Sequence, residues 1–132
     1  MSMTILLTDD DPGFRESVRQ ILVLEDYRVL EAKDGVEALR LLKSEEVGLL
    51  ITDILMPDME RVELCTKAKA LRPDLKVIGM TGGGSINADS VTGIAERFFH
   101  AFLKKPFDRQ DLLDKVKTFE SPVGRESVSS GR

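Results

Sequence analysis

The sequence predicts an α/β domain in which five strands alternate with five helices, with a parallel sheet covered by helices on both faces. Two observations carry this prediction. Short apolar runs of the length of a buried strand recur along the chain, and the segments between them have apolar residues at helical spacing. Because strand and helix alternate five times, with no connection suited to a hairpin, the strands are expected to run parallel.

The predicted strands are bounded apolar runs. They are Ile5–Leu7, Val29–Leu30, Leu49–Ile51, Leu75–Met80 and Phe99–Leu103. Each is short enough to be buried from end to end in a parallel sheet.

The predicted helices follow the strands and are defined by apolar residues that recur every three or four positions. They contain Phe14, Val18, Ile21 and Leu22; the segment Val36–Leu42; Leu64, Ala68 and Leu71; Val91, Ile94, Ala95 and Phe98; and Leu112, Leu113 and Val116. Two of them have start signals. Asp11 can cap a helix whose first residue is Pro12, and Asp108 can cap the last one, with Asp111 three residues on.

The length of 132 residues fits one domain, since folded domains usually run to about 100–150 residues. We expect residues 1–120 to form this domain. Residues 121–132 are expected to be a disordered polar tail, because Ser, Gly and charged residues replace the apolar period there.

Composition narrows the class of protein. The formal charge of -4 gives no overall positive field for a polyanion, so direct DNA binding is not expected. The apolar runs are far shorter than the roughly 18 residues of a membrane helix, and the start does not resemble a signal peptide, which predicts a cytoplasmic protein with no membrane contact. Cys65, the single cysteine, is expected to be a buried, inert thiol.

Carboxylates cluster at predicted strand ends. Asp9, Asp10 and Asp11 follow the first strand, and Asp53 ends the third. A capping role accounts for Asp11, but not for the others. If the first and third strands are neighbours, Asp9, Asp10 and Asp53 converge at the carboxyl edge of the sheet, where ligands bind in such folds. Their repulsion favours a bound hard cation, and Mg²⁺ prefers oxygen ligands.

Two further polar residues stand at the ends of the other strands. Thr81 follows the fourth strand and Lys105 follows the fifth. With a metal, an ammonium and a hydroxyl to stabilise phosphoryl oxygens, Asp53 could attack a phosphorus atom as the nucleophile.

This ordered set resembles the receiver domain of two-component response regulators, typified by the chemotaxis response regulator. The resemblance rests on Asp9-Asp10, on the run from Asp53 to Pro57, on Thr81-Gly82 and on Lys105-Pro106-Phe107, and it covers about residues 4–119. It implies a flavodoxin-like, doubly wound (βα)5 fold with strand order 2-1-3-4-5.

The resemblance also implies roles for the site residues. Asp53 would be phosphorylated, Lys105 would pair with the phosphoryl oxygens, and Thr81 would move toward them. Asp9, Asp10, Asp53 and the backbone carbonyl of Leu55 would hold Mg²⁺. The protein would then be a self-phosphorylating and self-dephosphorylating signalling domain rather than an enzyme in the usual sense.

The implied partners are a histidine kinase or histidine phosphotransfer protein as donor and a downstream protein as target. With no output domain in view, the signal is expected to leave by protein contact or by onward phosphoryl transfer, through a surface over about residues 87–119 of a monomer or weak dimer. His100, the only histidine, is expected to face solvent and not to act as a donor.

The sequence departs from the family at three places. Phe102 stands where an aromatic switch residue, commonly Tyr, is found, and it can be either a switch or simply core. Arg61 replaces a usual glycine, and Arg97-Phe98-Phe99 replaces the usual Gly-Ala turn before the last strand. The glycines 82–84 are expected to let the loop after Thr81 move.

Two alternatives stand beside the receiver interpretation. An aspartate-nucleophile phosphatase would need its nucleophile on the first strand, and usually a cap domain for which 132 residues leave no room. A binding-only pseudo-receiver would keep the fold without accepting a phosphoryl group.

Overall fold

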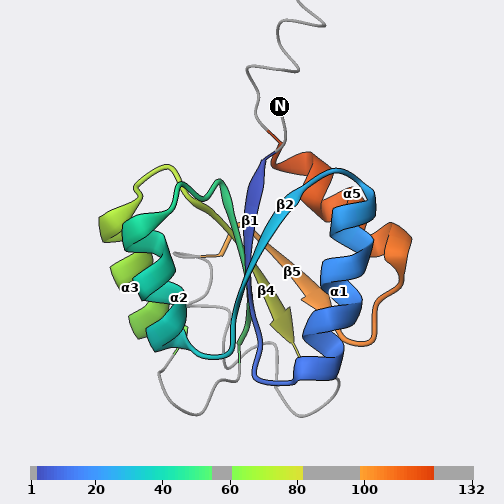
Figure 1. The fold of residues 1–132 in the computed structure, drawn as a ribbon, viewed down its shortest axis with the longest axis horizontal. Coiled ribbons are helices and arrows are strands. Elements are labelled where there is room, and N and C mark those ends of the chain that lie inside the picture. Colours follow the sequence, from blue (N-terminus) through green and yellow to red (C-terminus); the bar gives the residue numbers. More distant parts are fainter. Residues whose placement is uncertain (1–2, 55–60, 82–98, 121–132) are drawn as a thin grey trace, which may run out of the picture.

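The computed structural model describes residues 3–54, 61–81 and 99–120, which form five strands and four helices (Figure 1). The strands are β1 Thr4–Thr8, β2 Arg28–Ala32, β3 Leu49–Asp53, β4 Lys76–Thr81 and β5 Ala101–Lys104, and the helices are α1 Pro12–Leu24, α2 Gly35–Ser44, α3 Arg61–Leu71 and α5 Arg109–Thr118. All strand pairs are parallel, in the order β2-β1-β3-β4-β5. The predicted fold class is confirmed, including the strand order.

The helices cover both faces of the sheet, as predicted. Helices α1 and α5 lie on one face, and α2 and α3 lie on the other (Figure 1). Side chains of the central strands alternate between two buried clusters. Leu6 and Leu50 face α2 and α3, whereas Leu7 and Ile51 face α1 and α5. The two central strands therefore read as continuous apolar runs because each face has its own helical cover.

Local capping fixes where two helices begin. Asp11 accepts hydrogen bonds from the Gly13 and Phe14 backbone N–H groups at 3.0 and 3.2 Å, and Pro12 is the first helical residue. Asp108 caps α5 and forms a reciprocal capping box with Asp111. Both starts are as predicted, and each cap is worth about 1 kcal/mol of helix stability.

The expected burial of Cys65 is confirmed, and three expected segments lie outside the described residues. Cys65 is fully buried. Among the residues the structure describes, none of the helices is long and apolar enough to cross a bilayer. The helix expected around residues 91–98, the glycines 82–84 and the tail 121–132 fall outside the described ranges.

The apolar pattern was wrong at one helix position. Leu71 was assigned to the apolar stripe of α3 but is 38% exposed. Leu71 is the last residue of α3. Spacing identifies the covered face of a helix, but it does not show where the end of the helix extends beyond its cover.

Strand β5 begins later than predicted, at Ala101 rather than Phe99. Regular pairing with β4 starts at Ile78 and Ala101. Just before it, the His100 backbone N–H donates to the Val77 carbonyl at 2.7 Å, while His100 Nδ1 accepts from the Val77 N–H at 3.0 Å. The imidazole thus takes the place of a backbone carbonyl as acceptor. Val77 and His100 are hydrogen-bonded to each other, but they are not part of the regular backbone pairing of β4 with β5.

Candidate functional site

The topology brings two of the predicted acids together. Strands β1 and β3 are neighbours in the sheet, with Thr8 opposite Thr52. Asp9 directly follows β1, and Asp53 is the last residue of β3. One carboxylate oxygen from each of Asp9, Asp10 and Asp53 lies within 4.8 Å of the other two. The three carboxylates therefore meet at the carboxyl edge of the sheet, as the sequence predicted.

The three acids differ in their surroundings. Asp9 is fully buried, and its Oδ1 accepts a hydrogen bond from the Asp11 backbone N–H at 2.8 Å. Asp53 is 9% exposed. Asp10 is exposed to solvent. The cluster thus has a closed side at Asp9 and an open side at Asp10, from which a ligand can approach.

Lys105 links the two buried carboxylates. It follows β5, and its Nζ lies 2.9 Å from Asp9 Oδ2 and 3.1 Å from Asp53 Oδ2. The same Nζ lies 4.2 Å from the centroid of the Phe14 ring, a position suited to a cation–π contact. Burial acts to lower the pKa of Lys105, but its hydrogen bonds to Asp9 and Asp53, together with the negative charge of these carboxylates, outweigh burial, and the pKa is raised. The ammonium is therefore held in its charged form at the site.

Thr81 lies at the neighbouring strand end. It is the last residue of β4, is partly buried, and pairs in register with Lys104. Its backbone carbonyl accepts from the Lys105 N–H at 2.8 Å. Asp53 lies opposite Met80, the residue before Thr81. Leu55, whose carbonyl was the fourth predicted metal ligand, lies outside the described residues.

Phe102 is not a core residue. Its side chain is 36% exposed on β5, whereas its neighbour Leu103 is buried. The Phe102 ring lies 5.3 Å, centroid to centroid, from the ring of Phe99, which is 7% exposed. The interpretation of Phe102 as core is therefore wrong. Side chains alternate between the two faces of a strand, so Phe102 and the buried Leu103 point to opposite faces of β5.

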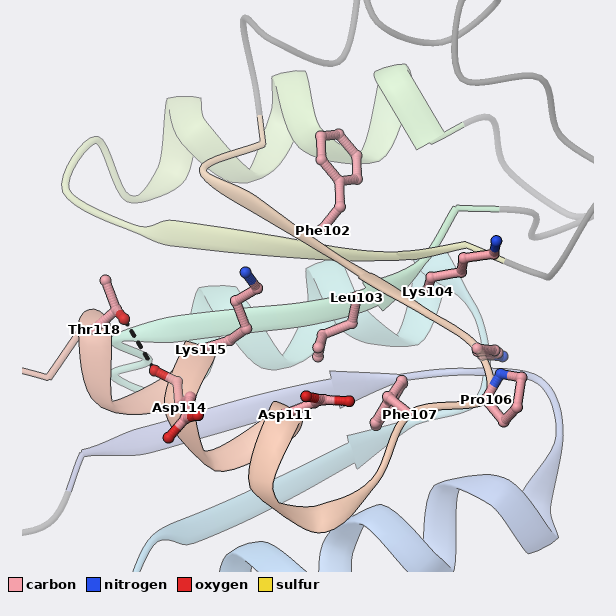
Figure 2. Close-up of a pocket in the computed structure, with 10 residues that line it drawn as sticks. Phe102, Leu103, Lys104, Pro106, Phe107, Asp111, Asp114, Lys115 and Thr118 are labelled. Atoms are coloured by element: carbon pink, nitrogen blue, oxygen red, sulfur yellow. Dashed lines mark hydrogen bonds between the residues drawn. The ribbon is translucent and has the colours of Figure 1, made fainter.

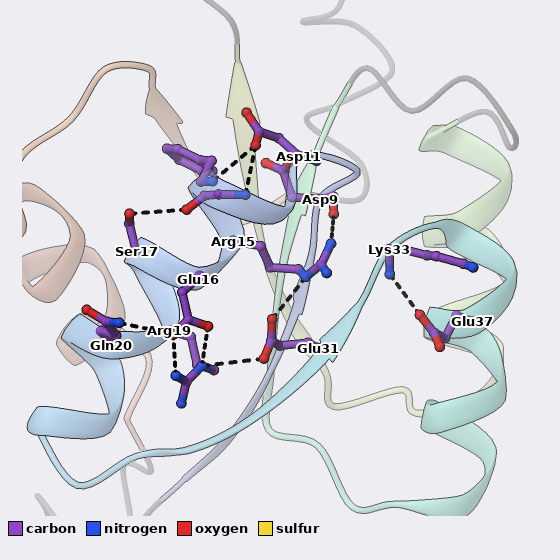
Figure 3. A network of polar contacts seen from close by, with 12 residues as sticks. Asp9, Asp11, Arg15, Glu16, Ser17, Arg19, Gln20, Glu31, Lys33 and Glu37 are labelled. Carbon is purple, nitrogen blue, oxygen red and sulfur yellow. Dashed lines mark hydrogen bonds and ion pairs between the residues drawn. The ribbon is translucent and has the colours of Figure 1, made fainter.

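A polar network that sequence reasoning missed lies behind Asp9 (Figure 3). The guanidinium of Arg15, on α1, donates from Nη1 to the Asp9 backbone carbonyl at 2.7 Å and from Nε to Glu31 Oε1 at 3.0 Å. Phe14, under the ammonium of Lys105, was likewise interpreted only as an apolar helix residue. No motif marks either residue. An arginine in the first turns of a helix usually faces solvent, so the sequence gives no reason to place Arg15 at the site.

The donor set suits a hard divalent cation. Three carboxylates at this spacing repel one another, and one ammonium neutralises only part of their charge. Oxygen ligands open to water on one side are what Mg²⁺ prefers. A carboxylate beside an ammonium and a metal site can also act as a nucleophile toward phosphorus.

Comparison with known proteins gives a consistent result. A family model described as the response regulator receiver domain matches residues 5–117. The response regulator MprA of Mycobacterium ulcerans (strain Agy99) is 34% identical over 117 residues, which are 89% of this chain and 50% of that protein. The transcriptional regulatory protein GlrR of Escherichia coli (strain K12) is 37% identical over 112 residues, which are 85% of this chain and 25% of that protein.

Solved structures agree with these relatives. A CheY-like response regulator receiver domain protein from Methanospirillum hungatei JF-1 has a TM-score of 0.82 and 36% identity, covering 89% of this chain and 93% of that chain. The chemotaxis protein CheY4 of Vibrio cholerae has a TM-score of 0.83 at 21% identity, covering 91% of this chain and all of that chain, and it shows the fold alone. The present chain spans about half the length of MprA.

Proposed function

The chain belongs to the response regulator receiver domain family of two-component systems, and on this premise we propose that Asp53 is its phosphoryl acceptor. Receiver domains are phosphoryl-accepting signalling domains. The observation that carries the assignment to Asp53 is its position: it shares the ammonium of Lys105 with Asp9 and lies within the cluster of three carboxylates.

We propose phosphohistidine, on a histidine kinase or phosphotransfer protein, as the donor. A carboxylate oxygen of Asp53 forms the new bond to phosphorus, the phosphorus–nitrogen bond of the donor breaks, and its electron pair stays on the imidazole nitrogen. Lys105, already within hydrogen-bonding distance of Asp53, then pairs with the phosphoryl oxygens. The hydroxyl of Thr81, at the adjacent strand end, donates a hydrogen bond to them.

The metal that fits this site is Mg²⁺. Its protein ligands would be carboxylate oxygens of Asp9, Asp10 and Asp53, with the Leu55 carbonyl, outside the described residues, as the fourth. When bound, Mg²⁺ offsets the negative charge of the carboxylates and of the incoming phosphoryl group. Asp9 is fixed before any metal arrives, because both of its carboxylate oxygens have hydrogen-bond donors.

We propose that the signal leaves by phosphorylation-dependent protein contact, or by onward phosphoryl transfer, over β5 and α5. A groove of about 650 Å³ lies along these elements, and Figure 2 shows the residues that line it. It is lined by Lys105, by the exposed Phe102 and by charged residues of both signs. The charged residues other than Lys105 are Lys104, Asp111, Asp114 and Lys115. Because Lys105 lines both the site and this groove, a movement of Lys105 at the site changes a surface that a partner can contact.

Incubation with acetyl phosphate and Mg²⁺, followed by mass spectrometry of the intact protein, tests the acceptor. We expect a gain of one phosphoryl group that hydroxylamine removes, as it does from an acyl phosphate, and that Asp53→Ala abolishes. Asp114→Ala, at an exposed acid on α5, is the matched control and should label normally. Labelling that persists in Asp53→Ala would refute the assignment. The absence of labelling with acetyl phosphate and with phosphohistidine donors would instead favour the pseudo-receiver.

Hydrolysis of small phosphate esters by Asp53→Asn tests the phosphatase alternative. A phosphatase with its nucleophile among the acids after β1 would survive this change and be lost in Asp9→Asn. We expect no such ester hydrolysis that survives Asp53→Asn, and the match to the receiver family over residues 5–117 supports this expectation.

A further inference from the structure

We propose that Arg15 is a positioning residue for the metal site: it holds the peptide between Asp9 and Asp10 so that the Asp10 carboxylate is presented to the cation. This inference rests on the proposed function, since it concerns the same cluster of carboxylates. It assigns a role to a side chain that is not itself a ligand.

The guanidinium of Arg15 is held between two structural elements (Figure 3). Its Nη1 donates to the Asp9 carbonyl oxygen at 2.7 Å, and its Nε donates to Glu31 Oε1 at 3.0 Å. Glu31 lies on β2, directly opposite Leu7 of β1. The Arg15 side chain is only 18% exposed. Arg15 therefore fixes the Asp9 carbonyl relative to the sheet, not merely relative to its own helix.

Asp10 is the ligand that most needs this support. Asp9 is held through both carboxylate oxygens, by the Asp11 N–H and by Lys105. Asp10 is exposed, and among the described residues its carboxylate has no hydrogen-bond donor. Because a peptide unit is planar, fixing the Asp9 carbonyl oxygen also fixes the nitrogen and Cα of Asp10. The direction in which the Asp10 side chain leaves the backbone then depends on Arg15.

The competing explanation is an ordinary surface ion pair, which usually contributes little. Arg19 offers a direct comparison. It lies one turn further along α1 and pairs with the same Glu31, at 3.4 Å, and with Glu16, at 2.6 Å. Within the described residues Arg19 makes no hydrogen bond or ion pair with Asp9. Replacing Arg19 therefore removes a similar charge and a similar ion pair, but leaves the Asp9–Asp10 peptide held.

For Arg15→Ala, electrostatics and positioning predict changes of opposite sign in Mg²⁺ affinity. Removing a positive charge near three carboxylates would, by Coulomb attraction alone, make Mg²⁺ bind more tightly. Loss of the support for Asp10 would make it bind more weakly. Groups that orient metal ligands typically change metal affinity by about 10–100-fold when they are replaced.

Isothermal titration of the full chain with Mg²⁺ tests the proposal. We expect Arg15→Ala to weaken Mg²⁺ binding by about tenfold and Arg19→Ala to leave it within about twofold of the wild type. Glu31→Gln, which keeps Arg15 but weakens its anchor, should change affinity in the same direction as Arg15→Ala. Unchanged or tighter binding in Arg15→Ala, or equal losses in the Arg15 and Arg19 variants, would overturn the proposal.

The rate of labelling by acetyl phosphate gives a second readout. With Arg15→Ala we expect the Mg²⁺ concentration for half-maximal rate to rise about tenfold, with the wild-type rate regained at saturating Mg²⁺. A loss that Mg²⁺ cannot restore would point to a general structural role and count against positioning. If the wild type itself accepts no phosphoryl group, the proposed function fails. The calorimetric comparison of Arg15 with Arg19 still decides the present inference in that case.

Discussion

The ring of Phe99 lies against the backbone of Gly79, in the space that a side chain at position 79 would need. A Cβ built on Gly79 would come within 2.9 Å of Phe99 Cδ1 and 3.1 Å of Ile54 Cδ1. Gly79 is in β4, two residues before Thr81, and Phe99 is 7% exposed. The phenylalanine in the unusual turn before β5 is thus matched to a glycine in the adjacent strand.

Gly79→Ala is expected to destabilise the protein by about 1–3 kcal/mol, the usual cost of overpacking a core. Urea unfolding measures the change. Gly13→Ala is the matched control, because a Cβ there would meet only Asp11 Oδ1, at an ordinary 3.5 Å. In the Gly79→Ala background, Phe99→Leu should cost less than it does alone, since the two positions share one space. Additive losses would show that the pair is not coupled.

Lys105→Gln should slow phosphoryl acceptance and tighten Mg²⁺ binding. The ammonium contacts both Asp9 and Asp53, so its removal takes a donor from the phosphoryl site and a competing cation from the carboxylates. Loss of such a donor costs about 100-fold in rate. Acetyl phosphate labelling and Mg²⁺ calorimetry measure the two effects. Lys104→Gln, at the exposed neighbour, should change neither, and a wild-type rate in Lys105→Gln would contradict the role given to it.

Stability should fall as pH drops below about 6.5, through His100. Partial burial of the ring, followed by Lys69 and Lys76, lowers the pKa of His100 from its ordinary 6.5, and outweighs an opposite effect of the Val77 backbone. As pH falls, His100 is therefore protonated in the unfolded state before it is protonated in the folded state. The contribution of neutral His100 to stability is complete above the unfolded pKa and is lost as pH falls toward the folded pKa.

Thermal unfolding at about pH 7.5 and about pH 5.5 checks this prediction, because most carboxylates stay ionised over that interval. The neutral His100 Nδ1 accepts from the Val77 N–H, and its ring meets Phe119 edge-on at 6.0 Å. His100→Asn should lower the melting temperature at the higher pH and flatten its pH dependence. An equal pH dependence in both proteins would assign the effect to other groups.

Thr8→Val should stabilise the protein by about 1 kcal/mol, since a buried hydroxyl without a partner costs free energy that a methyl group does not. Thr8 is fully buried at the end of β1, and its hydroxyl has no hydrogen-bond partner within the described part of the chain. Thr52, opposite it in register, is also buried, but its hydroxyl donates to the Asp53 carbonyl at 3.2 Å. Thr52→Val should therefore destabilise, and urea unfolding of the two variants should give opposite signs.

Much of the fold was predictable because its signals are local. Apolar spacing predicted the five strands and the four described helices. The caps at Asp11 and Asp108 were predicted from adjacent residues. The signal failed for Leu71, which continues the apolar period of α3 without being buried. It also failed at the start of β5, where an imidazole takes the place of a backbone acceptor.

The sequence by itself determined the order of chemical residues along the chain, with Asp9, Asp53, Thr81 and Lys105 each at or just beyond a strand end. Once the strands are parallel, such positions meet at one edge of the sheet, so their convergence follows from topology. Only the tertiary structure decided that Lys105 spans Asp9 and Asp53, that Arg15 holds the Asp9 carbonyl, and that Phe99 fills the space over Gly79. These contacts join residues on separate elements, and their energies depend on side-chain geometry at the packed interface, which no local spacing encodes.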